Sequence, residues 1–152
     1  MGMKICKGIA LKPLIHPSIL SVEIISNYKA NKEVFMADCA CGGGNIYVFA
    51  CSGAADVGAL SDRVARKLSR SGKGKMYCMA AVGANIPEKI APLKNALGLV
   101  AIDGCSSLCS KKVLERAGFK PVSYNLEDFG FKKGKTEVND ETIGRAISTM
   151  GL

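Results

Sequence analysis

The feature that most constrains the fold is an alternation of short apolar runs with helical segments, which begins near residue 45. Residues 46–51, with the sequence IYVFAC, form an apolar run rich in strand-forming residues. Such a run is typical of a buried strand in a parallel sheet. In residues 55–70 the apolar side chains return with the spacing of one helix face. A strand followed by a helix of this length predicts a parallel α/β unit.

The same alternation continues to the end of the chain. We expect further strands at 75–82, 99–103 and 121–126, and helices at 88–97, 107–117 and 139–147. Right-handed crossovers between parallel strands place helices on both faces of a sheet. The prediction is therefore a three-layer α/β domain, Rossmann-like or flavodoxin-like, with a parallel sheet of about four strands.

Residues 1–35 do not follow this alternation. Pro13 and Pro17 interrupt them, and residues 19–25 fit either a strand or a short helix. The whole chain of 152 residues has the length of one domain. We therefore expect an N-terminal extension at 1–35, which need not be native to the domain, and a single domain at 36–152. Met36 is then a candidate initiator.

The composition excludes several classes of protein. With 48% hydrophobic and 22% charged residues, the chain is not a disordered one. No apolar run approaches the ~20 residues of a membrane-spanning helix, so no membrane association is expected. The net charge is +8, but the basic residues are spread out, and there are four tyrosines, five phenylalanines and no tryptophan. Stacking surfaces for bases are therefore scarce, which disfavours nucleic acid and leaves an unknown protein or small molecule as the partner.

The expected chemistry is that of cysteine. The single histidine, His16, lies near the N-terminus, which excludes Ser-His-Asp and Cys-His mechanisms in the body of the chain. The start of the sequence lacks the pattern of a secretory signal, so we expect a cytoplasmic protein with reduced thiols. Clustered cysteines in that compartment more often bind metal or do redox chemistry than form disulfides. The seven are Cys6, Cys39, Cys41, Cys51, Cys78, Cys105 and Cys109.

Four of these cysteines are predicted to meet at one edge of the sheet. Cys51 ends the first strand, Cys78 lies in the second, and Cys105 comes just after the third. Cys109 follows four residues later, where the next helix opens. Ligands of open parallel sheets bind beyond the carboxyl ends of the strands, and four thiolates satisfy a tetrahedral zinc ion. For Cys78 the alternative is burial as a small apolar side chain.

Two further groups are secondary candidates for this site. Cys39 and Cys41 precede the first strand and so begin at the opposite edge, although the glycines at 42–44 would let the chain bend back. Asp56 and Asp103 are the carboxylates nearest the predicted edge, where they would orient ligands or act as a base. For Asp56 the alternative is that it charges or caps the start of a helix.

Several ordered motifs carry a resemblance to a known family. The segments CSGAADVG at 51–58 and KMYC at 75–78 precede Asp103-Gly104-Cys105, with Cys109 beyond it. Together they resemble the DGC-domain family, which is named for that tripeptide and whose biochemical role is not established. The resemblance begins near Met36, and the CACGG segment at 39–43 matches a family-like start. It implies a zinc-binding domain at 36–152, with Cys51, Cys78, Cys105 and Cys109 as the ligands.

These observations favour a zinc-binding protein with a structural, metal-sensing or metal-handling role. Four protein ligands would close the metal to substrate, which argues against an enzyme. One alternative is a thiol-redox protein, or a metal-dependent hydrolase in which water replaces one cysteine. Another is an iron–sulfur cluster, which four cysteines also hold.

Overall fold

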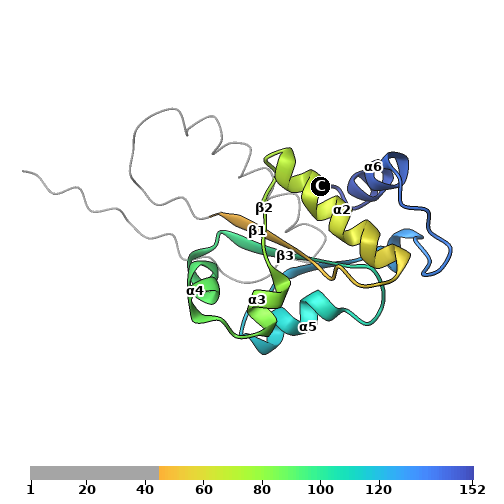
Figure 1. Cartoon of the computed structure of the whole chain (residues 1–152). Coiled ribbons are helices and arrows are strands. Elements are labelled where there is room, and N and C mark those ends of the chain that lie inside the picture. Colours follow the sequence, from red (N-terminus) through yellow and green to blue (C-terminus); the bar gives the residue numbers. More distant parts are fainter. Residues whose placement is uncertain (1–44) are drawn as a thin grey trace, which may run out of the picture.

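The structure, a computed structural model, describes residues 45–152 and contains one four-stranded parallel sheet within them (Figure 1). The strands lie in the order β2-β1-β3-β4. Their bounds are Ile46–Ala50 for β1, Lys75–Met76 for β2, Gly98–Asp103 for β3 and Val122–Asn125 for β4. The predicted parallel α/β fold is thus confirmed. The predictions for the extension 1–35, for Met36 and for Cys6, Cys39 and Cys41 lie outside the described residues.

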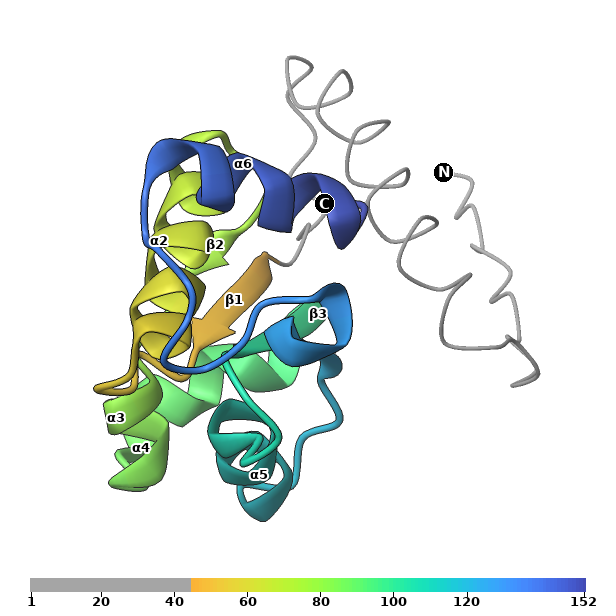
Figure 2. The ribbon, with the colours of Figure 1, turned by 90° about the vertical axis from the view of Figure 1, so that its right-hand side faces the viewer.

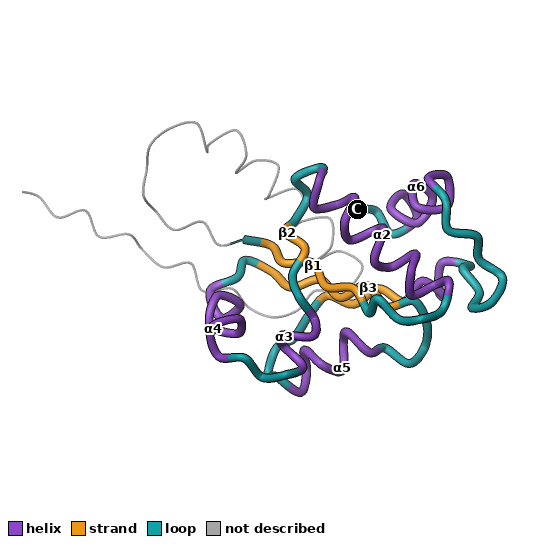
Figure 3. Tube along the Cα trace, in the orientation of Figure 1, coloured by secondary structure: helices purple, strands orange, loops and turns teal. Residues whose placement is uncertain are grey.

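Helices cover both faces of the sheet, which gives three layers (Figures 1 and 2). One face carries α2 and α6, and the other carries α3, α4 and α5 (Figure 3). The bounds are Asp56–Arg70 for α2, Met79–Gly83 for α3, Pro87–Ile90 for α4, Cys109–Arg116 for α5 and Asp140–Thr149 for α6. There are also two short 3-10 helices. One, η1 at Ala91–Asn95, lies between α4 and β3, and the other, η2 at Leu126–Phe129, lies between β4 and α6. Among residues 45–152, none of the helices has the length and apolarity needed to cross a bilayer.

Burial on both faces of the sheet explains why the sequence of the central strand β1 is apolar throughout. Val48 and Ala50 face the core under α2 and α6, whereas Tyr47 and Phe49 face the core under α3 and α5. All five residues of the strand are buried. Because side chains alternate between faces along a strand, a strand covered on both sides has no polar positions.

Two predicted elements were wrong in extent. The expected strand at 75–82 stops at Met76, and the residues from Met79 form α3, because methionine and alanine favour a helix and Val82 is buried in the core on that face. The expected helix at 88–97 ends as an α-helix at Ile90 and continues as η1. Pro92 accounts for this change, because a proline inside a helix removes a hydrogen bond and clashes with the preceding turn.

Candidate functional site

The four predicted ligands lie at the carboxyl edge of the sheet. Cys51 directly follows β1, while Cys78 and Cys105 each come two residues after β2 and β3. Cys109 is the first residue of α5. Because β2, β1 and β3 are neighbouring parallel strands, these chain segments emerge at the same edge. Cys51 and Cys105 are half-buried, Cys78 and Cys109 are exposed, and all four are free thiols. The alternative that Cys78 is a buried apolar side chain is therefore wrong.

The sulfur of Cys51 is held by two neighbours. The backbone N–H of Gly104 donates to Cys51 Sγ over 3.3 Å, and Ser61 Oγ lies 3.2 Å from the same sulfur. The fully buried Ser61 hydroxyl already donates its one proton to the carbonyl of Gly58 over 2.8 Å. The Ser61 oxygen is therefore available as an acceptor at its contact with the Cys51 sulfur. These contacts fix the sulfur between α2 and the loop that follows β3.

Two glycines allow this approach of backbones. A Cβ atom on Gly104 would lie 2.6 Å from the carbonyl carbon and oxygen of Val57, and one on Gly58 would lie 2.4 Å from the carbonyl oxygen of Gly53. Both distances are shorter than side chains tolerate, so glycine is required at each position. The contact between Gly104 and α2 is also what brings the Gly104 N–H to Cys51.

Asp103 organises the loop that contains Cys105. Its carboxylate, 1% exposed, accepts the backbone N–H groups of Ser110 over 2.7 Å and Lys111 over 3.1 Å. These are two of the unpaired N–H groups at the start of α5, so the side chain caps the helix from a distance. The residue at the N-cap position, Leu108, has a φ of 52° and makes no side-chain cap. Asp103 thereby sets where α5, and with it Cys109, begins.

Asp56 ties a distant loop to the start of α2. Its two carboxylate oxygens accept the backbone N–H groups of Gly134 and Thr136, each over 2.8 Å. These two hydrogen bonds, led by that of Gly134, lower the pKa of Asp56 below its usual value. Asp56 is also the first residue of α2, where a negative charge suits the helix dipole. The alternative of a structural carboxylate at a helix start thus fits the contacts of Asp56.

Three polar residues of this edge were not predicted. Glu127, just beyond β4, accepts a hydrogen bond from the backbone N–H of Ser106 over 2.8 Å and so supports the Cys105–Cys109 loop.

Asp62 accepts a hydrogen bond from the Ser52 hydroxyl over 3.0 Å. A second hydrogen bond, from Arg66, lowers the pKa of Asp62. Ser61 lies against Cys51. A position just beyond a strand end was the available signal for Glu127, whereas Ser61 and Asp62 lie inside a helix pattern.

The described residues do not hold a ready-made metal centre. Within residues 45–152, no three side chains of His, Cys, Asp or Glu are gathered as metal ligands. The structure links the Cys51 sulfur to the Cys105 loop through the Gly104 N–H. The secondary candidates Cys39 and Cys41 are outside the described range. The four-cysteine site therefore stays a prediction.

Comparisons with known proteins agree with the motifs. The family model for the DGC domain matches residues 47–150. The chain is also similar to the anaerobic and virulence modulator AnvM of Pseudomonas aeruginosa, with 33% identity over 87 residues. That alignment covers 57% of this chain and 66% of AnvM, so the chain spans slightly less than two thirds of that relative. No solved structure matches the chain significantly.

Proposed function

The chain belongs to the DGC-domain family, and from that premise we propose that it binds zinc through Cys51, Cys78, Cys105 and Cys109. The observation that carries the proposal is the strand order β2-β1-β3. Each of these neighbouring strands is followed within two residues by a cysteine, and the fourth cysteine opens α5. Thiolates are the ligands that structural zinc sites prefer, with Zn–S distances of about 2.3 Å.

The donor chemistry fits zinc, whereas the ligands are not yet gathered. We therefore propose that binding draws the exposed Cys78 and Cys109 towards Cys51. The sulfur of Cys51 is the natural fixed point, because Gly104 and Ser61 already hold it. Cys109 lies at the N-terminal end of α5, where the helix dipole favours negative charge and so supports a thiolate. A zinc ion bound by four thiolates would act as a cross-link between loops at this edge.

The proposed role is structural, metal-sensing or metal-handling rather than catalytic. Four protein ligands leave no open position for a substrate. The printed name of the relative AnvM describes a modulator, which is in keeping with a sensing role for this chain; its partner would be a protein or a small molecule. The cysteines within residues 45–152 are free thiols, in keeping with the reducing cytoplasm that we propose as the compartment.

The position of Cys51 supports one alternative, thiol chemistry. Cys51 is half-buried and lies just beyond β1, at the carboxyl edge of the sheet where ligands of parallel sheets bind. A metal-dependent enzyme or an iron–sulfur protein would use the same cysteines. A colourless protein with one bound zinc supports the first proposal, whereas visible absorption and bound iron would support a cluster.

Metal analysis of the full chain, purified without oxygen, tests the proposal. Replacing Cys105 with serine should remove most of the zinc, and the matched control Cys6→Ser should retain it. Zinc affinity should also fall as the pH is lowered, because the ligands bind as thiolates and become protonated. Circular dichroism would establish that both variants are folded. Full zinc occupancy in folded Cys105→Ser would refute the four-cysteine site.

A further inference from the structure

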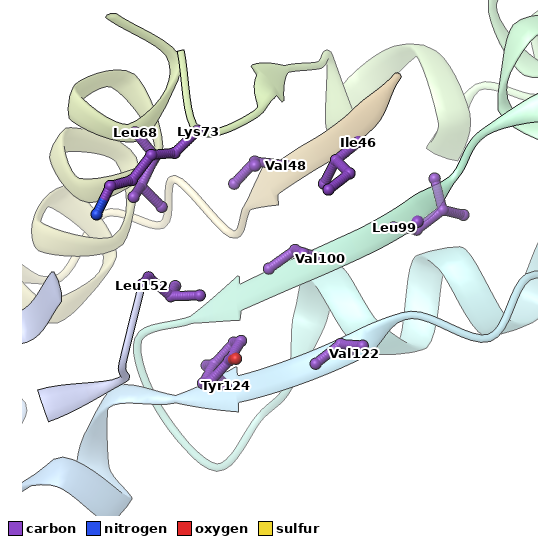
Figure 4. Close-up of a pocket in the computed structure, with 10 residues that line it drawn as sticks. Ile46, Val48, Leu68, Lys73, Leu99, Val100, Val122, Tyr124 and Leu152 are labelled. Atoms are coloured by element: carbon purple, nitrogen blue, oxygen red, sulfur yellow. The ribbon is translucent and has the colours of Figure 1, made fainter. Parts of the chain in front are cut away.

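An apolar hollow lies on the sheet face that carries α2 and α6 (Figure 4). It includes the first residues of β1, β3 and β4, so it lies towards the amino ends of the strands, away from the cysteines. Its lining residues include Ile46, Val48, Val100, Val122, Tyr124 and Leu152. Val100, Val122 and Leu152 are only half-buried, so the hollow is partly open to solvent.

The size of the hollow indicates what can occupy it. Its volume is about 30 Å³. A cavity that encloses benzene measures about 150 Å³, and pockets for drug-sized ligands measure about 300–1,000 Å³. The hollow is therefore too small to bury a small-molecule ligand. It has room for the end of a single apolar side chain that belongs to a larger partner.

One basic side chain borders this hollow, and three more form a row on the exposed face of α2. Lys73 lies beside Leu68 at one end of the hollow (Figure 4). Arg63, Lys67 and Arg70 come before it in the sequence, on the exposed face of α2 that is turned away from the buried stripe containing Leu68. All four basic side chains are exposed. Within residues 45–152 none of the four belongs to an ion pair, since the pairs there are Arg66–Asp62 and Lys111–Glu115.

We propose that the hollow and this basic row form one docking surface for an acidic segment of a partner protein. An aliphatic side chain of that segment would enter the hollow beside Lys73, and its carboxylates would pass round the C-terminal end of α2 to Arg70 and Lys67. Charge complementarity selects the acidic partner. The apolar wall selects a protein over a nucleic acid, because a phosphate backbone offers nothing to fill the hollow. This surface is separate from the proposed zinc site and does not depend on it.

Binding of two synthetic peptides to the full chain tests this proposal. One fluorescein-labelled peptide carries leucines among glutamates, and the second has serine in place of every leucine at the same net charge. Fluorescence anisotropy should show that the leucine peptide binds about tenfold more tightly or better, since one buried apolar anchor typically has this effect. Its affinity should also fall as salt is added.

Variants locate the binding on this face. Lys73→Glu should weaken binding of the leucine peptide about tenfold, because it reverses a charge at the edge of the hollow. Val122→Thr, which keeps the shape of the side chain but adds a hydroxyl, should weaken the same peptide and leave the serine peptide unchanged. The matched control is Lys112→Glu, which makes the same charge change on α5 at the opposite face of the sheet and should have no effect.

Several outcomes would overturn the proposal. Equal affinity for the two peptides would show that charge alone acts. Tighter binding of single-stranded DNA of equal charge, or of phosphatidylglycerol vesicles, would assign the basic row to another class of partner. No peptide binding by the full chain would mean that the hollow is closed, by residues 1–44 or by a second copy, or is inert. Unchanged binding in folded Lys73→Glu would also refute the docking site.

Discussion

Replacing Asp103 with alanine removes the side chain that fixes the start of α5. The carboxylate is 1% exposed and accepts two backbone N–H groups, those of Ser110 and Lys111. Leu108 occupies the N-cap position and makes no side-chain cap, so within residues 45–152 this end of α5 depends on the Asp103 carboxylate. The variant therefore leaves two N–H groups at the start of α5 without their partner.

The expected loss of stability follows from these two bonds. Hydrogen bonds to a charged group contribute about 1.5–3 kcal/mol each, and loss of a helix cap alone costs about 0.5–2 kcal/mol. Relief from burying an ionised carboxylate offsets part of the sum. We expect Asp103→Ala to lower the free energy of unfolding by about 2–4 kcal/mol. The free energy of unfolding of Asp103→Asn should lie between those of Asp103→Ala and the wild type, since the amide oxygen of asparagine still accepts one N–H.

Urea unfolding followed by circular dichroism measures this loss. With an m value of about 2 kcal/mol/M, the midpoint should fall by about 1–2 M while m itself stays constant. The matched control is Asp128→Ala, an exposed carboxylate whose partner is the side chain of Asn125, and it should change stability by less than about 0.5 kcal/mol. An equally small change in Asp103→Ala would refute the capping role.

Three further predictions concern other parts of the chain. Gly104→Ala should cost about 2–3 kcal/mol in urea unfolding, because its Cβ would press on the backbone of Val57; unchanged stability would contradict the close approach. Two backbone amides hold the pKa of Asp56 below its unfolded value, so its contribution to stability is present at neutral pH and is lost as the pH falls below about 4. In acid titrations Asp56→Asn should therefore lose less stability below that pH than the wild type, and equal losses would refute this. A chain that begins at Met36 should keep the melting temperature and zinc content of the full chain, whereas loss of either would show that residues 1–35 pack on the domain.

The strongest sequence patterns predicted the fold most closely. The first strand and the helix after it were placed within one residue of β1 and α2, because an apolar run and a clear helical stripe lie side by side. The run at 75–82 was misjudged, since a short apolar run suits a strand and a buried helix equally. Its division into β2 and α3 depends on packing against neighbours that are distant in the sequence.

The position of the candidate site was predictable for a topological reason. Parallel strands end at one edge, so the cysteines that follow β1, β2 and β3 are carried there whatever the details of the loops. The roles of the carboxylates were not predictable, because their partners are set by tertiary structure. Asp56 accepts N–H groups from Gly134 and Thr136, about 80 residues away in the chain. No local pattern around Asp56 specifies such a contact.

The tripeptide Asp103-Gly104-Cys105 combines structural contacts with a candidate metal ligand. Asp103 caps α5, which sets the position of Cys109. Gly104 permits contact with Val57 and donates its N–H to the sulfur of Cys51. Cys105 carries a half-buried thiol between these two anchors. Asp103 and Gly104 thus have structural roles that are independent of any metal. A variant at Asp103 or Gly104 that lost zinc would therefore report on the framework, and only substitution of the cysteines themselves tests the ligands.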